Sequence, residues 1–391
     1  MSVTLVRTLR SLALIAAATT GLHAQNRDHF PKATPESEGL SSASLAAISD
    51  QMESWVDEGR VVGAEVLIVK NRRTVFHDMV GWKDREKEIA WEPNTICRIR
   101  SMTKPFVGTA VLMLVDEGRL SVSDPVSQYI SAFDNERSRD ITIEQVLTHT
   151  AGFTQPGYPA ALQSYGSLRE AVDAVGNAGP PNDPGTKWIY SDAGSATLGA
   201  LIAEVSGMPA EEFIRLRIVE PLGLTSTLMN LSDDSPLRPR VSSTYRSTPS
   251  GSFFKYWDST GPQVMKFFRA SGGIYSTTTD YARFLAFWMD GGTTGTTQLL
   301  SPELVESALQ VDPLSQDVHP YGYQWQIFEQ SDPSNPSSMF MFGHGGSDGT
   351  IAWAIPSEDL IVVYFTQSRG GNTRDEIGRV VEKAFGADWF E

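Results

Sequence analysis

Ser101-Met102-Thr103-Lys104 places a hydroxyl and an amine three residues apart at the start of a predicted helix. Residues at that spacing lie on one face of a helix, so the two side chains would be neighbours. A serine hydroxyl is a weak nucleophile until a base within hydrogen-bond reach takes its proton, and a deprotonated lysine can be that base. The spacing therefore predicts a nucleophilic serine with a lysine partner.

The same spacing recurs at Ser252-Phe253-Phe254-Lys255, so the surrounding sequence has to separate the two copies. A short strand-like segment, 95–100, precedes Ser101, and apolar residues recur at helical spacing after it. Pro105 is tolerated only in the first turn of a helix, which predicts a helix that begins close to Ser101. The second copy follows a Gly-Ser turn and precedes aromatic residues, and we predict a loop there.

Residues 1–24 are typical of a secretory signal peptide. Arg7 and Arg10 precede a short apolar run, and Leu22-His23-Ala24 forms an exit of mostly small residues. A cytosolic protein with an incidental amino-terminal helix is the alternative. The apolar run is too short to span a bilayer, and no later stretch reaches about 20 apolar residues. We therefore expect a periplasmic or secreted protein without stable membrane insertion.

The composition is that of a globular protein, with 40% hydrophobic and 20% charged residues. The formal net charge is −15, and it becomes −17 once the two arginines of residues 1–24 are removed. So acidic a chain disfavours nucleic acid or an anionic membrane as a partner. The single Cys97 allows no internal disulfide, so we expect it to be packed inside a core that needs none.

Strand-like patterns occur at both ends of the chain, and helical patterns lie between them. This order predicts an α+β fold in which both termini complete one sheet and a mostly helical unit is inserted. We assign residues 25–105 and 270–391 to the sheet domain, and residues 106–269 to the helical domain, with the cleft at their junction. The expected helices are 41–58, 142–149, 196–205, 211–216, 279–288 and 375–385, and the expected strands are 64–70, 74–80, 323–328, 339–342, 350–355 and 360–366.

Tyr190 follows a proline-rich loop and opens a helical stretch, a position from which a side chain can point into a cleft. A serine hydrolase that uses lysine often needs a further group to carry protons, and a phenol beside an ammonium can do so. An ordinary half-buried tyrosine is the alternative reading of this residue.

The segment from Phe342 to Thr350 is rich in glycine and is flanked by predicted strands. Glycines there let a substrate approach the backbone and leave N–H groups available to an oxyanion, although a loose hairpin turn would look the same. Ser347 lies in a G-x-S-x-G match, the nucleophile elbow of another hydrolase fold. A strand pattern follows Ser347 and no histidine follows His344, so the elbow interpretation fails.

The six histidines show no paired spacing that would bind a metal ion, and the chain has no phosphate-binding or dinucleotide-binding fingerprint. Cofactor-free chemistry is therefore favoured. For the serine–lysine pair we expect a small-molecule ester or amide as the substrate.

Three motifs in order resemble the penicillin-recognising serine hydrolases of the class C β-lactamase type. They are S-x-x-K at Ser101 to Lys104, Y-x-N as Tyr190-Ser191-Asp192, and the K/H-x-G strand as His344-Gly345-Gly346. Three further phrases, residues 146–152, 221–225 and 271–276, are also similar to that family. The resemblance covers the chain from about residue 35 to its end, and it implies an antiparallel sheet of the β-lactamase/transpeptidase type.

The resemblance also implies roles for the motif residues. Ser101 would be the acylated nucleophile, Lys104 and Tyr190 would manage its proton, and the backbone N–H groups of Ser101 and Ser347 would hold the oxyanion. His344, Gly345 and Gly346 would line the cleft opposite Tyr190.

Two positions depart from the family pattern. Asp192 stands where the family has asparagine, so a group that only accepts hydrogen bonds replaces one that also donates them. We expect Asp192 to pair with Lys104, keep it protonated, and shift the work of the base to Tyr190. His344 replaces a lysine that is usual in the β-lactamases, so a fixed positive charge for a substrate carboxylate is lost.

These features favour a secreted serine hydrolase that forms an acyl-enzyme on Ser101. Among the possible activities, we favour a carboxylesterase that acts on short-chain or aryl esters. A β-lactamase or D-Ala-type DD-peptidase or D-aminopeptidase is the alternative, and a non-catalytic binding or scaffold protein of the same fold is a third possibility. The natural substrate and the oligomeric state are not determined by the sequence.

Overall fold

The computed structural model describes residues 30–263, 265–330, 339–387 and 389. The expected signal peptide, residues 1–24, lies outside the described residues. Within them, no helix combines the length and the apolar character that crossing a membrane requires.

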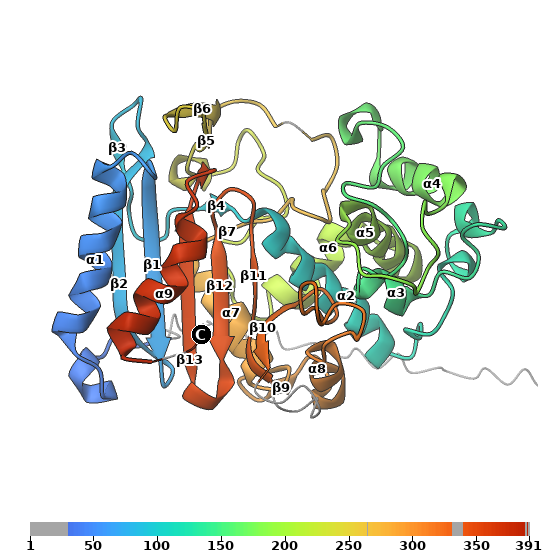
Figure 1. Cartoon of the computed structure of the whole chain (residues 1–391). Coiled ribbons are helices and arrows are strands. Elements are labelled where there is room, and N and C mark those ends of the chain that lie inside the picture. Colours follow the sequence, from blue (N-terminus) through green and yellow to red (C-terminus); the bar gives the residue numbers. More distant parts are fainter. Residues whose placement is uncertain (1–29, 264, 331–338, 388, 390–391) are drawn as a thin grey trace, which may run out of the picture.

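A seven-stranded antiparallel sheet joins the two ends of the chain (Figure 1). Strands β1 and β13 lie side by side at its centre, with Val66 opposite Tyr364, so the amino-terminal hairpin and the carboxy-terminal strands form one sheet. The predicted α+β fold with a sheet built from both termini is therefore confirmed. In spatial order the strands are β10 (Gln326–Gln330), β11 (Met339–Gly345), β12 (Ile351–Ile355), β13 (Leu360–Thr366), β1 (Gly63–Lys70), β2 (Arg73–Asp84) and β3 (Ile89–Ala90).

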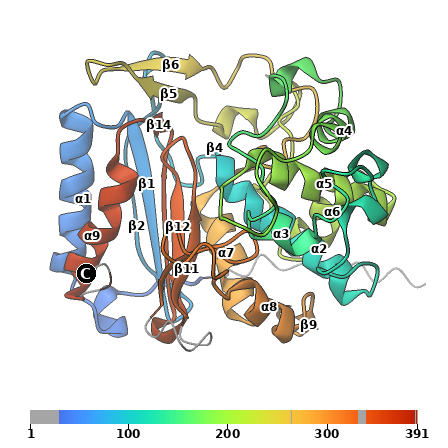
Figure 2. The same ribbon diagram turned by 45° about the vertical axis from the view of Figure 1, so that its right-hand side comes forward.

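Helices cover both faces of this sheet. α1 (Ser42–Asp57) and α9 (Thr373–Phe385) lie against one face, and α7 (Thr278–Met289) lies against the other (Figure 2). In α1 the apolar residues recur every three or four positions, so one stripe faces the sheet. Trp55 on that stripe is fully buried, and its ring meets the edge of Tyr364 at 6.2 Å.

A group of helices lies beside the sheet, on the right in Figure 1. Two of them, α2 (Lys104–Asp116) and α5 (Asp192–Ser206), are apolar on nearly all sides and are buried over most of their length. The others are α3 (Ile143–Leu147), α4 (Leu168–Ala178) and α6 (Ala210–Ile214). The division into domains at 25–105, 106–269 and 270–391 stays a prediction.

The remaining elements are short. They are β4 (Cys97–Arg98) paired with β7 (Tyr275–Ser276), β5 (Thr244–Ser247) between β6 (Phe253–Trp257) and β14 (Ser368–Arg369), β8 (Thr293–Thr294) with β9 (Thr297–Gln298), and α8 (Pro302–Ala308).

Three sequence-based expectations need correction. The loop predicted at the second serine–lysine copy is wrong, because β6 begins one residue after Ser252 and pairs with β5. Lys255 lies on that strand, and its Nζ donates to Asp84 Oδ1 at 2.6 Å. The helix predicted over 142–149 ends at Leu147, since His149 adopts a left-handed conformation with φ 63°. The strand predicted from residue 323 begins at Gln326.

The turn between β11 and β12 approaches the backbone that leads to Ser101. A Cβ atom added to Gly346 would lie 2.2 Å from Thr350 Oγ1 and 2.4 Å from the carbonyl oxygen of Ile99. Both distances are shorter than van der Waals contact, so only glycine fits there. The Gly346 N–H donates to the Thr350 carbonyl at 2.6 Å and closes the turn. The turn is thus held against the segment that carries Ser101.

Gly346→Ala should lower the free energy of unfolding by about 1–3 kcal/mol, the usual cost of forcing extra atoms into a packed site. Gly345→Ala is the matched control, because the nearest atom to its added Cβ is Arg374 Cδ at 3.6 Å, an ordinary contact. Urea unfolding followed by circular dichroism measures both variants. Equal loss of stability in the two would contradict the close approach at Gly346.

Candidate active site

Ser101 lies in a short 3₁₀ helix, Arg100–Thr103, that runs directly into α2. The helix begins where Pro105 predicts, because proline occupies its second position and loses no hydrogen bond there. Two contacts to the segment before β7 fix this region: the Ile99 N–H donates to the Ile274 carbonyl at 3.1 Å, and the Ile274 N–H donates to Thr103 Oγ1 at 3.1 Å.

Lys104 is the first residue of α2, and its side chain is fully buried. Its Nζ donates to Asp192 Oδ1 at 2.8 Å and to the Ser271 carbonyl oxygen at 3.2 Å. The same nitrogen lies 4.5 Å from the centroid of the Tyr190 ring. A carboxylate, a carbonyl and an aromatic face are all partners that suit an ammonium group.

Asp192 opens α5 and lies between two cations. Its second carboxylate oxygen accepts from Arg269 at 2.8 Å and from Gln155 Nε2 at 3.2 Å, and its own N–H donates back to Gln155 Oε1 at 2.9 Å. Burial raises the pKa of Asp192, but the Lys104 and Arg269 charges outweigh burial and hold that pKa well below its usual range. Asp192 is therefore a carboxylate, and the Lys104–Asp192 pairing expected from the sequence is present.

Tyr190 is half-buried and belongs to a cluster of rings. Its ring centroid lies 4.6 Å from that of His149, 6.2 Å from that of Tyr321 and 6.4 Å from that of His344. The left-handed backbone at His149 lets its Nδ1 accept the Ser191 N–H at 3.4 Å, so His149 packs beside Tyr190. These contacts fix the Tyr190 ring over Lys104.

His344 is buried and electrically neutral. Its Nδ1 lies 2.7 Å from the Gly345 carbonyl, which can only accept, so Nδ1 carries the proton. Its Nε2 then accepts from the Tyr321 hydroxyl at 2.9 Å. Burial, reinforced by the Lys104 charge, lowers the pKa of His344 to about 3. His344 therefore presents no positive charge to a substrate.

An ion pair links the two segments that carry the expected oxyanion donors. Arg100, the neighbour of Ser101, pairs with the fully buried Asp348, the neighbour of Ser347. Arg100 adopts φ 51°, a region that costs energy for any residue other than glycine and that often marks functional sites. Among the hydrogen bonds of the described residues, none uses the Ser347 N–H as donor. That amide is thus available to a ligand near Ser101.

A cleft of about 510 Å³ brings five of the predicted site residues together: Ser101, Tyr190, His344, Gly345 and Ser347. The other three do not line it. Lys104 and Asp192 lie beneath Tyr190, and Gly346 forms the contact with Ile99 described above. The motifs therefore contribute part of the wall of the cleft and two of the charges behind it.

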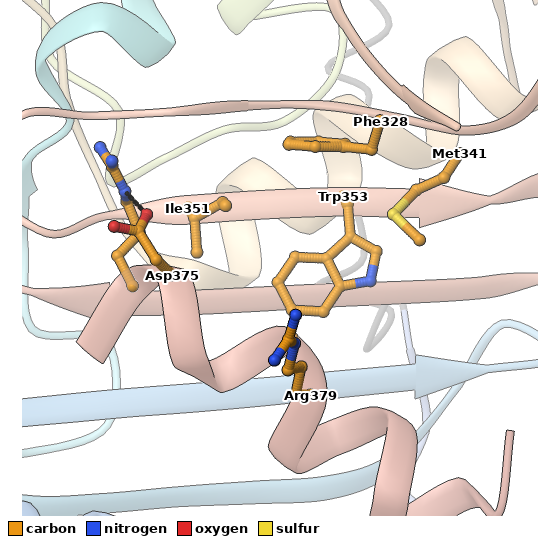
Figure 3. Close-up of a pocket in the computed structure, with 8 residues that line it drawn as sticks. Phe328, Met341, Ile351, Trp353, Asp375 and Arg379 are labelled. Carbon is orange, nitrogen blue, oxygen red and sulfur yellow. Dashed lines mark hydrogen bonds and ion pairs between the residues drawn. The ribbon is translucent and has the colours of Figure 1, made fainter. Parts of the chain in front are cut away.

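A side pocket of about 320 Å³ adjoins the cleft and shares Phe328, Ile351, Arg374 and Asp375 with it (Figure 3). Figure 3 shows the Trp353 ring at its centre, with the other apolar side chains around it. The remaining lining residues are Met341, Trp353, Gly378 and Arg379. This pocket gives the cleft an aromatic extension with arginines on its rim.

Sequence reasoning missed several residues of this site. Arg269 and Gln155 hold Asp192, and Tyr321 holds His344, yet none belongs to one of the three motifs. The available signal was indirect, because Arg269 lies two positions before one of the three auxiliary phrases, 271–276. Long-range contacts of this kind become visible only in the fold.

Comparison with known proteins agrees with this geometry. The Beta-lactamase family model matches residues 46–386. Protein Rv1367c of Mycobacterium tuberculosis (strain ATCC 25618 / H37Rv) is 28% identical over 357 residues, which cover 80% of this chain and 87% of that protein.

Two solved structures share the fold. EstCE1, a hydrolase with promiscuous acyltransferase activity, has a TM-score of 0.73 at 22% identity, and the match covers 87% of this chain and 98% of EstCE1. The D-amino acid amidase from Ochrobactrum anthropi SV3 has a TM-score of 0.70 at 20% identity, with 88% and 98% covered. Because the family model spans most of the sequence, the chain belongs to the Beta-lactamase family of serine hydrolases.

Proposed function

We propose that the chain is a secreted or periplasmic carboxylesterase that acylates Ser101 with short-chain or aryl esters. The observation that carries this proposal is the Lys104–Asp192 ion pair, buried beneath Tyr190 in a cleft that Ser101 also lines. A serine, a phenol and a buried cation together form a proton-transfer system that suits acyl transfer.

In the proposed reaction Tyr190 acts as a phenolate: Ser101 Oγ attacks the ester carbonyl carbon, and its proton passes to the phenolate oxygen of Tyr190, which becomes a neutral phenol. The Lys104 ammonium lies over the Tyr190 ring, where a cation favours negative charge on the phenol. The backbone N–H groups of Ser101 and Ser347 donate hydrogen bonds to the oxyanion. Tyr190 then returns the proton to the departing alcohol, and water cleaves the acyl-enzyme by the same route.

Two features favour esters over β-lactams and peptides. The neutral His344 offers no positive charge for the carboxylate of a penicillin or a D-Ala terminus. Asp192 offers no hydrogen-bond donor where the family has an asparagine, and Lys104 and Arg269 occupy its two oxygens beneath Tyr190. The side pocket around Phe328 and Trp353 suits an aryl group. An amide-cleaving enzyme, such as a β-lactamase or D-aminopeptidase, is the runner-up.

Ser101→Ala should lower kcat/KM for p-nitrophenyl butyrate by at least about 10³-fold, because the nucleophile is lost. Ser347→Ala is the matched control; it keeps the backbone amide and should retain most activity. Wild-type protein should hydrolyse the ester faster than nitrocefin or D-alanine p-nitroanilide. Faster turnover of nitrocefin than of the ester would favour a β-lactamase. Faster turnover of the anilide would favour an aminopeptidase. If none of the three compounds is hydrolysed, a binding protein is favoured.

Asp192→Asn should lower the free energy of unfolding at pH 7 by about 3–5 kcal/mol, since Lys104 loses its buried counter-ion. The pKa of Asp192 is lower in the folded state than its unfolded value of about 3.9. The contribution of Asp192 to the free energy of unfolding is therefore fully present above about pH 4. It is lost as the pH falls toward the pKa of Asp192 in the folded state. The difference between wild type and variant should shrink below pH 4 in urea titrations.

Asp183→Asn on the exposed proline-rich loop is the control for that experiment, and it should leave stability unchanged. The same Asp192 variant tests the proton route through its pH–rate profile with p-nitrophenyl butyrate. A profile identical to that of the wild type would show that Asp192 does not set the charge beneath Tyr190.

A further inference from the structure

A second cavity, of about 170 Å³, borders the segment that carries Ser101. Four basic residues line it, and Glu211 is the one acid among the lining residues described. This concentration runs against the composition, because the whole chain has a net charge of −15. The basic residues are Arg98, Arg100, Lys266 and Arg269, and we call this space the basic cavity.

Arg98 is held at the basic cavity without an acidic partner. Its guanidinium lies 4.9 Å from the centroid of the Trp257 ring and 5.7 Å from that of Tyr275, so two aromatic faces fix its position. None of the ion pairs among the described residues includes Arg98. Burial and the neighbouring Arg100 charge lower the pKa of Arg98. Arg98 therefore lies next to the Arg100 charge without an ion-pair partner of its own among the described residues.

Arg100 and Arg269 have acidic partners but keep further donors. In the hydrogen bonds of the described residues, Arg100 uses Nε, which pairs with Asp348. Arg269 uses Nε toward Ser271 Oγ at 3.0 Å and one terminal nitrogen toward Asp192 at 2.8 Å. A guanidinium carries five N–H donors, so each retains donors that a ligand in the cavity can accept.

We propose that the basic cavity binds a small oxyanion, either a carboxylate or a phosphate group. Its volume is that of several water molecules at roughly 30 Å³ each, which is the scale of such a group. Planar guanidinium groups bind both kinds of anion through paired hydrogen bonds.

An anion bound in the basic cavity would affect the active site through Arg269. This residue lines the cavity and also holds Asp192, which in turn pairs with Lys104. An anion that attracts Arg269 weakens its hold on Asp192 and alters the charge beneath Tyr190. The anion is either an acidic group on the substrate or a free oxyanion that regulates turnover.

Calorimetric titration of the wild-type protein with inorganic phosphate tests the binding site itself, and this arm does not rest on the proposed esterase activity. Arg98→Gln should weaken phosphate binding at least about tenfold, since it removes a charged donor. Arg98→Lys keeps the positive charge but loses the planar guanidinium with its paired donors. Its affinity for phosphate should lie between those of the wild type and Arg98→Gln. Thermal unfolding verifies that each variant is folded.

Arg60→Gln is the matched control, because Arg60 also lies over a tryptophan, 5.8 Å from the Trp55 ring, but outside the cavity. It should leave phosphate binding unchanged.

A kinetic comparison, which rests on the proposed function, separates the two sources of the anion. If the substrate carries it, Arg98→Gln lowers kcat/KM for mono-p-nitrophenyl succinate about tenfold and leaves p-nitrophenyl butyrate unchanged. If a free oxyanion is the ligand, phosphate changes butyrate turnover in the wild type and not in Arg98→Gln. The proposal is overturned if the wild type and Arg98→Gln bind phosphate equally well. It is also overturned if the wild type binds no phosphate and Arg98→Gln shows no selective loss of kcat/KM for the succinate ester.

Discussion

A row of alternating charges, in which Lys104 and Asp192 are buried and Arg269 is half-buried, is the interaction on which the cleft depends. The three residues come from the start of α2, the start of α5 and the segment before β7, so the row ties together parts of the chain that are distant in sequence. Burying any one of these charges alone would cost several kcal/mol, and the row is stable because each charge has its partner. The apolar packing of α2 and α5 brings the first residues of both helices to the same place.

The sequence predicted the fold because strand patterns occurred at both chain ends, and a sheet needs its strands paired. It also located Ser101, Tyr190 and His344, since their chemistry stands in local motifs. It could not show that Arg269 reaches Asp192 or that Tyr321 reaches His344, because those contacts join residues that are 77 and 23 positions apart.

The strand at Phe253–Trp257 was missed for a different reason. Its aromatic residues lie on both faces, with Phe254 and Tyr256 exposed and Phe253 and Trp257 buried, so the alternation of polar and apolar residues is hidden. The neutral state of His344 was also beyond the sequence, since burial and two hydrogen bonds determine it.

The segment from Arg98 to Ser101 borders two cavities of opposite character. Ser101 faces the cleft with its neutral His344 and its aromatic side pocket, whereas Arg98 and Arg100 line the basic cavity. Arg269 lines the basic cavity and also pairs with Asp192, which gives the acidic protein a local positive region near Ser101. Under the two proposals, acyl transfer at Ser101 and anion binding take place in separate cavities, and Arg269 couples them.

The most direct measurement is peptide mass mapping after inactivation with a fluorophosphonate, which forms a stable adduct with an activated serine. The account predicts a single adduct, on the peptide that contains Ser101. An adduct on Ser347, on Ser252 or on any other serine would contradict it, as would a protein that reacts with no fluorophosphonate at all.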